Sequence, residues 1–174
     1  TSGFGEVDEE GRRREEELGR LARDTGVRIL GPNCVGVYCP ASKLTNADNL
    51  PRESGPIGMI SHSGSLTHLV VWNCEPRGMR FSKMVSCGNE CDLNAADLLE
   101  YLGQDDDTRI IVCYLEGMKN GPKFVRLAKE VARRKPIILW KGGITERGAR
   151  AAASHTGALG GSREIWEAAI RQTG

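Results

Sequence analysis

Four short apolar runs recur from residue 56 onward, and a helical pattern follows each of them. The runs are "PIGMIS" (56–61), "FSKMVSCG" (81–88), "RIIVCYLEG" (109–117) and "PIILWKGG" (136–143). The helical patterns cover 65–75, 94–103, 121–134 and 162–172. Strands that alternate with helices of ten to fifteen residues are typical of right-handed βαβ units and a parallel sheet covered on both faces. The sequence predicts an α/β fold with a flavodoxin-like doubly wound parallel sheet over 56–174.

The first 55 residues lack this alternation. Opposite charges three and four residues apart in "GRRREEELGRLARDTG" predict a solvated helix over 8–24, and "VRIL" (27–30) predicts a short strand. Residues 31–55 are rich in Pro, Ser, Asn and Asp, which predicts a long irregular linker and a domain boundary. Because the chain opens without methionine and closes directly after a helical pattern, we expect an excised piece, truncated at its C-terminus.

The charge balance excludes a general attraction to polyanions. Twenty-four basic and twenty-three acidic side chains give a net charge of +1, so we expect no nucleic-acid or membrane partner. No apolar run approaches the roughly 20 residues that span a bilayer, and no signal-peptide pattern is present. We expect a soluble, cytoplasmic protein that binds any anion through local groups.

Six cysteines lie in or beside apolar segments without a CxxC pair. Disulfide frameworks belong to small secreted chains, so we interpret all six as reduced structural thiols. Cys87 and Cys91 could reach one zinc ion, but no second pair or well-spaced histidine completes four ligands, and we predict no metal site.

Ligands of such sheets bind beyond the carboxyl ends of the strands, and four segments of this chain should meet there. In "ISHSGSLTHLV", Ser63, Gly64 and Ser65 begin a helix whose free N–H groups and dipole form an anion site. An ordinary serine N-cap explains the same residues. His62 in this turn could face an anion when protonated, whereas His68 on the helix is expected to be packed or solvated.

The other three segments supply one candidate each. Glu116 in "YLEGMKNG" could orient an imidazole, or could be a solvated loop carboxylate. His155 in "ASHTGALGG" has small neighbours that leave it accessible, which makes covalent use of the imidazole plausible. In "GPNCVG", Asn33 and Cys34 follow the predicted strand 27–30, where packing or a passive contact is the simplest role for the thiol.

In this order the segments resemble those of the NDP-forming acyl-CoA synthetases, a family that includes ADP-forming acetyl-CoA synthetase and the succinyl-CoA synthetase alpha subunit. The resemblance covers nearly the whole chain. It rests on "LARDTGVRILGPNCVGV", "GPIGMISHSGSLT", "GNECDLNAADLLEYL" and "ASHTGALGG". It implies that residues 1–30 are the end of a Rossmann-like CoA-binding domain that precedes the flavodoxin-like domain.

The resemblance implies a role for each candidate. His155 matches the family's phosphohistidine, which relays a phosphoryl group between an acyl phosphate and a nucleoside diphosphate. Glu116 matches the carboxylate that holds this histidine. The other matches fall into a phosphate-binding set and a CoA and acyl-substrate region, namely Ser63, Gly64, Ser65, Thr156 and Gly157 for the first, and Asn33 and Cys34 for the second.

The resemblance also implies partners that this chain lacks. Most of the CoA-binding domain and the whole ATP-grasp domain are missing, so CoA, ATP or ADP, and Mg²⁺ belong to the full enzyme, and none should bind tightly to this piece. The missing domains or subunits would dock on an exposed face, which could otherwise drive homodimerisation. His62 stands where the succinyl-CoA branch has arginine, which predicts weaker, pH-dependent help with the phosphate.

Two alternatives come from other classes of protein. The scaffold could serve as a non-catalytic phosphate-binding or protein-interaction module, although such a role requires neither His155 nor Glu116. A flavodoxin proper could place a phosphate on "SHSGSLT", but the nine aromatic residues show no clear pair to sandwich a flavin ring.

Overall fold

A five-stranded sheet forms the centre of the molecule. The computed structural model describes residues 2–45, 47–145, 148 and 163–173. The strands are β1 (Gly36–Tyr38), β2 (Ile57–Ser61), β3 (Phe81–Ser86), β4 (Ile110–Leu115) and β5 (Ile137–Lys141), in the order β1-β3-β2-β4-β5. β2 to β5 are parallel, and β1 pairs antiparallel with β3. Counted from β2, the parallel strands follow the order 2-1-3-4 of flavodoxin-like sheets, which confirms the predicted fold.

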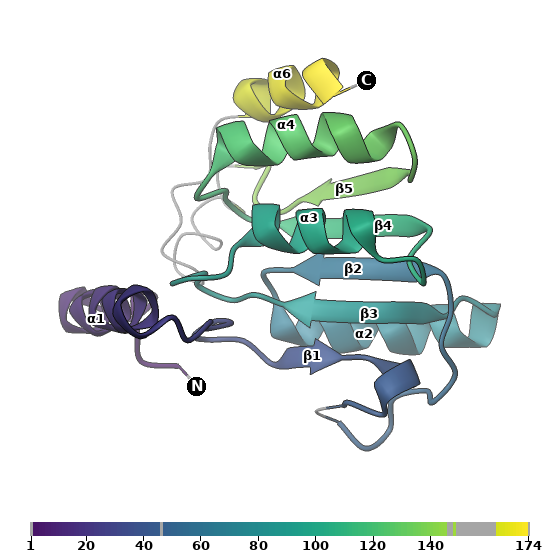
Figure 1. Cartoon of the computed structure of the whole chain (residues 1–174), viewed down its shortest axis with the longest axis horizontal. Coiled ribbons are helices and arrows are strands. Elements are labelled where there is room, and N and C mark those ends of the chain that lie inside the picture. Colours follow the sequence, from purple (N-terminus) through teal and green to yellow (C-terminus); the bar gives the residue numbers. More distant parts are fainter. Residues whose placement is uncertain (1, 46, 146–147, 149–162, 174) are drawn as a thin grey trace.

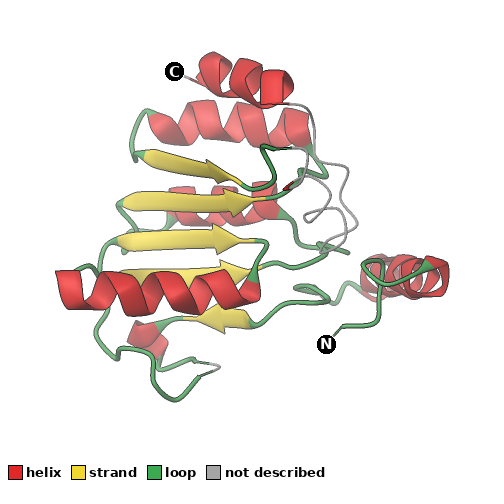
Figure 2. Ribbon diagram, turned by 180° about the vertical axis from the view of Figure 1, so that it is seen from behind, coloured by secondary structure: helices red, strands yellow, loops and turns green. Residues whose placement is uncertain are grey.

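Helices cover both faces of the sheet (Figures 1 and 2). α3 (Ala95–Gln104) and α4 (Gly121–Ala132) lie on one face, and α2 (Gly64–Cys74) lies on the other. α6 (Arg163–Thr173) packs beside α4. α1 (Glu9–Thr25) stands beyond the carboxyl ends of the parallel strands, as Figure 1 shows. These bounds agree with the helices predicted from the sequence.

Alternate residues of the central strands supply two cores. Met59 and Met84 are fully buried in the core on the α2 side, with Val71 of that helix. Their strand neighbours Ile60 and Val85 belong to the core on the α3 and α4 side. Successive side chains of a strand point to opposite faces, so a strand buried on both faces must be apolar throughout.

Short polar side chains cap the starts of α1 and α3. Asp8 caps the start of α1 by accepting a hydrogen bond from the Gly11 N–H at 2.7 Å, and Gly26, with a left-handed φ of 74°, caps its end. Asn94 and Asp97 form a reciprocal capping box that begins α3. Each cap satisfies N–H groups that the first helical turn leaves without partners.

The prediction for residues 27–55 is wrong in two places. Residues 27–30 form no strand, because their backbone bonds a loop: the Ile29 N–H donates to Asp92 Oδ2 at 2.7 Å, and Ile29 O accepts from Leu93. The segment 31–55 is not irregular throughout, since it contains β1 and a short 3₁₀ turn, Pro40–Ser42. β1 adds an antiparallel edge to a sheet that the sequence predicts as wholly parallel. None of the described helices has the length and apolar character needed to cross a bilayer.

Candidate functional site

The carboxyl ends of β2 and β4 bring two of the predicted segments into contact. Directly after β2, the His62 N–H donates to the carbonyl of Tyr114 on β4 at 3.0 Å. The adjacent turn leads into α2, and Glu116 follows the end of β4 by one residue. The loop "SHSGS" and the carboxylate therefore share one edge of the sheet, as the sequence predicts.

Ser63 caps α2 at this edge. Its Oγ accepts from the Leu66 N–H at 3.3 Å, and its carbonyl accepts from Thr67 Oγ1 at 2.7 Å. The N–H groups of Gly64 and Ser65 lie in the first turn of α2, where the helix itself supplies no acceptor, so they can donate to an anion. Ser65 is exposed, and its hydroxyl lies 3.4 Å from that of Ser63. The cap and the anion site are therefore compatible uses of one turn.

The "GPNCVG" turn lies against the start of α2. A Cβ atom on Gly64 would lie 2.6 Å from Cγ1 of Val35, so only glycine lets the turn approach this closely. On its other side the turn meets the loop after β3. There the Asn89 N–H donates to Pro32 O at 2.9 Å, and a Cβ on Gly88 would lie 2.1 Å from that oxygen.

The two residues singled out in this turn differ in their surroundings. Asn33 adopts a left-handed φ of 55°, and its amide donates to Asn89 Oδ1 at 3.2 Å. The half-buried Cys34 thiol lies 3.6 Å from the carbonyl oxygen of Leu30. The structure thus brings both to the same sheet edge as the α2 loop.

Glu116 has one satisfied and one unsatisfied carboxylate oxygen. Tyr114 donates its hydroxyl hydrogen to Oε1 at 3.2 Å. Oε2 is buried and has no hydrogen-bond partner among the described residues, in a residue that is only 7% exposed. A buried carboxylate oxygen without a donor is costly, so this atom indicates a place for a further N–H or O–H group.

The Glu116 backbone is held on both sides. Its N–H donates to Nδ1 of His62 at 3.1 Å, and its carbonyl accepts from Lys141 Nζ at 2.8 Å. Lys141 also donates to the Gly142 carbonyl and lies over the ring of Trp166. Burial lowers the pKa of Lys141, and the charge of Glu116 opposes this shift only in part.

Tyr114 and Lys141 were not identified from the sequence. For Tyr114 a signal exists, because residues two apart in a strand share a face, and Tyr114 is two residues before Glu116. No local signal points to Lys141, which reaches Glu116 only through the pairing of β4 with β5.

From the sequence His62 could face an anion when protonated, but in the structure it does not. Its side chain is 3% exposed and points inward, where Nε2 lies 3.1 Å from Oε1 of Glu90. The ring is therefore bound at both nitrogens by Glu116 and Glu90. His68, in contrast, lies against the Trp72 ring at 5.7 Å, as expected for a packed helix residue.

The buried cluster of His62, Cys87 and Glu90 resembles a metal-ligand set, since its donor atoms lie within 4.8 Å of one another. A metal ion would need the Nε2 lone pair of His62. The Nδ1 lone pair is already occupied by the Glu116 N–H, and a neutral imidazole has only one unprotonated nitrogen. The cluster does not fit a metal ion in this geometry.

The six cysteines are free, as the sequence predicts. Cys39, Cys87 and Cys113 are buried, and the other three are partly buried. Burial raises the pKa of the Cys113 thiol to about 12 and that of Cys87 well above its ordinary value. Such thiols stay protonated and pack as small apolar groups.

Three predicted site residues, His155, Thr156 and Gly157, lie outside the described residues. Their assignments remain predictions.

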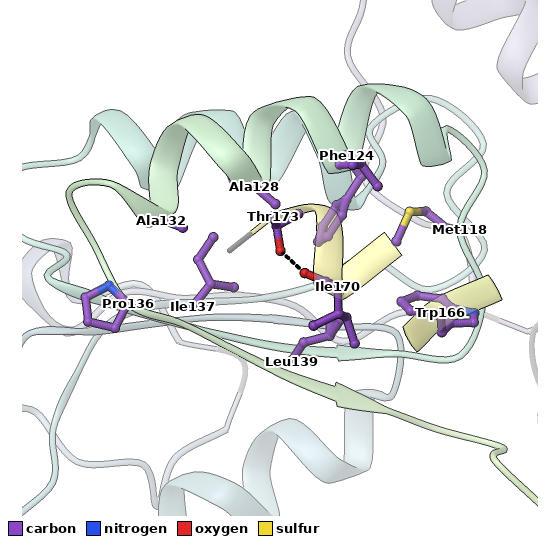
Figure 3. Close-up of a pocket in the computed structure, with 11 residues that line it drawn as sticks. Met118, Phe124, Ala128, Ala132, Pro136, Ile137, Leu139, Trp166, Ile170 and Thr173 are labelled. Atoms are coloured by element: carbon purple, nitrogen blue, oxygen red, sulfur yellow. Dashed lines mark hydrogen bonds between the residues drawn. The ribbon is translucent and has the colours of Figure 1, made fainter. Parts of the chain in front are cut away.

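An apolar cavity of about 310 Å³ lies between α4, β5 and α6 (Figure 3). Figure 3 shows Phe124, Leu139 and Trp166 directed toward it. Among the described residues, no titratable side chain lines it. It is therefore separate in chemistry from the polar edge around Glu116.

Comparisons of this chain with protein-family models and with known proteins match it to CoA ligases. A family model described as "Succinyl-CoA ligase like flavodoxin domain" matches residues 54–174. The chain is 45% identical over 174 residues to subunit alpha of the ADP-forming acetate–CoA ligase II of Pyrococcus furiosus. It is 39% identical over 179 residues to the ADP-forming 4-hydroxybutyrate–CoA ligase of Nitrosopumilus maritimus. Both alignments include all of this chain, but only 38% and 26% of the relatives.

A solved structure from Ca. Korarchaeum cryptofilum agrees with these relatives. It is a dinucleotide forming acetyl-coenzyme A synthetase 1 in complex with phosphate and ADP, 43% identical, with a TM-score of 0.88. The match covers 99% of this chain and 38% of that one. Because the family model spans most of the sequence and the fold agrees, the chain belongs to the NDP-forming acyl-CoA synthetase family.

Proposed function

We propose that this chain is the phosphoryl-relay part of an NDP-forming acyl-CoA synthetase, an acid–thiol ligase, and that His155 carries the phosphoryl group. The observation that carries the proposal is the buried Oε2 of Glu116, which has no hydrogen-bond partner in the part of the chain that the structure describes. A histidine N–H is the donor that such an oxygen lacks. The ligase names of the relatives support the same chemistry.

In the relay, one imidazole nitrogen of His155 keeps its proton, and this N–H donates a hydrogen bond to Oε2 of Glu116. The other nitrogen attacks the phosphorus of an acyl phosphate. An N–P bond forms while the P–O bond to the acyl group breaks, and the acid leaves as a carboxylate. A terminal oxygen of a nucleoside diphosphate then attacks the phosphorus, the N–P bond breaks, and a nucleoside triphosphate results.

The start of α2 would bind the phosphoryl oxygens. The N–H groups of Gly64 and Ser65 and the exposed Ser65 hydroxyl provide donors where negative charge arrives. We assign Thr156 and Gly157 to the same phosphate-binding set. His62 is not a member, because both its nitrogens are engaged in the interior.

The remaining parts of the reaction belong to a longer protein. We assign 1–30 to the end of a CoA-binding domain, 31–55 to a linker that contributes β1, and 56–174 to the relay domain. Asn33 and Cys34 would line the CoA and acyl-substrate region. CoA, the nucleotide and Mg²⁺ would bind largely through the CoA-binding and ATP-grasp domains or subunits, in a cytoplasmic enzyme. Ile138 and Trp140 on β5, both about half exposed, could contact such partners or a second copy.

The experiment uses the full-length parent protein with Mg²⁺-ATP, followed by intact mass measurement and phosphorus NMR. Wild type should gain an acid-labile, alkali-stable phosphoryl adduct that His155→Asn abolishes. His68→Asn is the matched control, because His68 packs against Trp72 on α2, and it should keep the adduct. A folded, nucleotide-binding parent without an adduct under any substrate condition would favour the alternative, a non-catalytic phosphate-binding module.

A further inference from the structure

His62 has a hydrogen-bonding pattern that fixes its tautomer. Nδ1 lies 3.1 Å from the backbone nitrogen of Glu116, which can only donate, so Nδ1 is unprotonated. Nε2 lies 3.1 Å from Oε1 of Glu90, so Nε2 carries the ring proton and donates a hydrogen bond to this oxygen. The ring is a neutral Nε2–H tautomer, with one donor bond and one acceptor bond.

This ring replaces a strand partner that the sheet does not supply. β2 ends at Ser61, and the last backbone hydrogen bond from this segment to β4 runs from the His62 N–H to the carbonyl oxygen of Tyr114. The N–H of Glu116, two residues further along, would then lack a partner on this side. Nδ1 of His62 accepts it instead, so a side chain continues the ladder by one bond beyond the strand.

The ring itself is anchored to a third element. Oε1 of Glu90 accepts from the Ala95 N–H at 2.6 Å, in the first turn of α3. The Glu90 side chain is 3% exposed, and its backbone has a left-handed φ of 57°. A continuous chain of hydrogen bonds thus runs from the start of α3 through Glu90 and His62 to Glu116.

We infer that His62 is a positioning residue for the relay: its Nδ1 fixes the peptide of Glu116, and Glu90 fixes the ring. This role rests on the proposed function of Glu116. The carboxylate that would hold His155 begins at a Cα atom whose peptide is bound by His62 on one side and Lys141 on the other. Loss of the Nδ1 bond leaves the Glu116 N–H buried without an acceptor. The carboxylate can then shift away from the position in which it would hold His155 for attack on the phosphorus.

Two substitutions separate the two ring nitrogens. In His62→Asn the side-chain oxygen can take the place of Nδ1 and accept from Glu116, but the bond to Glu90 is lost. In His62→Gln the amide nitrogen can take the place of Nε2 and donate to Glu90, but the acceptor for Glu116 is lost. If His62 served only to stabilise the fold, the Asn variant should not phosphorylate faster than the Gln variant. Gln has the longer side chain and keeps the buried hydrogen bond to Glu90.

The test measures single-turnover phosphorylation of the full-length protein by Mg²⁺-ATP. His62→Gln should slow phosphorylation about tenfold or more, the effect of one lost hydrogen bond to a buried group, with an unchanged KM for ATP. His62→Asn should stay within about threefold of wild type. Equal rates for the two variants, or a faster Gln variant, would overturn the inference. Thermal melting shows whether each variant is folded.

A second measurement does not depend on the reaction. Nitrogen NMR of ¹⁵N-histidine-labelled protein, assigned by loss of the signal in His62→Asn, should show Nδ1 unprotonated and Nε2 protonated. A protonated Nδ1 would overturn the inference whatever the phosphorylation rates of the variants. If wild type forms no phosphohistidine but shows this tautomer, the proposed function fails while the support of Glu116 by His62 stands.

Discussion

The Tyr114 hydroxyl donates a hydrogen bond to Oε1 of Glu116 at 3.2 Å, whereas Oε2 has no donor among the residues that the structure describes. The phenol and carboxylate are two residues apart and project from the same side at the end of β4. One carboxylate oxygen is thereby hydrogen-bonded to β4, and the other can accept a hydrogen bond from a ligand or from another segment of the chain.

Replacing Glu116 with Gln tests whether its negative charge serves the relay. The amide keeps the size of the side chain but loses the charge that, in the proposed relay, would stabilise His155 during phosphoryl transfer. We expect phosphohistidine formation in the full-length protein to fall about 100-fold or more, as for other preorganised electrostatic groups. Glu130→Gln is the control, because Glu130 lies exposed on α4 beside Arg126 and should retain the wild-type rate. A rate close to wild type for Glu116→Gln would remove the carboxylate from the mechanism.

The ionisation of Tyr114 reports on the same pair. Burial, the charge of Glu116 and their hydrogen bond together raise the pKa of Tyr114 to about 12. Glu116→Gln removes the negative charge, so Tyr114 should ionise at lower pH, while burial keeps its pKa above 10. Ultraviolet titration, with Tyr114→Phe to identify the signal, measures this shift. An unchanged titration would mean that the two groups are not in contact.

The close approach of Val35 to Gly64 predicts a local steric coupling. Gly64→Ala should lower the free energy of unfolding by about 1–2 kcal/mol, because the new methyl group would overlap Cγ1 of Val35. In a Val35→Ala background the same change should cost little. Gly121→Ala is a matched control, since Gly121 is also the first residue of a helix but has 3.8 Å of room. Denaturant unfolding of the wild type, the two single variants and the double variant gives the coupling, and additive effects would contradict it.

The ion pair of Asp105 with Lys83 predicts a pH-dependent contribution to stability. Burial raises the pKa of Asp105, but hydrogen bonds from Lys83 at 2.8 Å and Thr108 at 2.5 Å outweigh it, so the net pKa is lowered. A lowered carboxyl pKa stabilises the fold fully above the unfolded pKa of about 3.8, and this stabilisation is lost as pH falls through the folded value.

Asp105→Asn should therefore cost about 2 kcal/mol at neutral pH, and the difference from wild type should disappear in acid. Asp106→Asn, at the exposed neighbouring position, should change stability little at any pH. Urea unfolding between pH 7 and pH 2 tests this, and a difference that stays constant with pH would contradict the assignment.

The parallel part of the fold follows from the sequence because each strand is a nearly continuous apolar run between helical patterns. The missed elements depend on partners distant in the chain. Residues 36–38 form a strand through pairing with β3, where Gly36 faces Ser86. Residues 27–30 are apolar enough for a strand, but their backbone bonds the loop around Asp92 instead.

The same reasoning applies to the site. The edge that gathers Ser63, Asn33 and Glu116 is predictable, because parallel strands end together. The inward direction of His62 is not, because it depends on an N–H of Glu116 and a carboxylate of Glu90, 54 and 28 residues away.

The turn of residues 31–35 is held between two glycines, with no room for a methyl group at Gly64 or at Gly88. Contacts this tight transmit displacement instead of absorbing it. A shift of the segment that leads from α1 into β1 must carry the start of α2 and the loop after β3 with it. A displacement of the chain that precedes this turn would thus move the start of α2, where the phosphoryl group is proposed to bind. No residue of the preceding chain would need to contact the phosphoryl group.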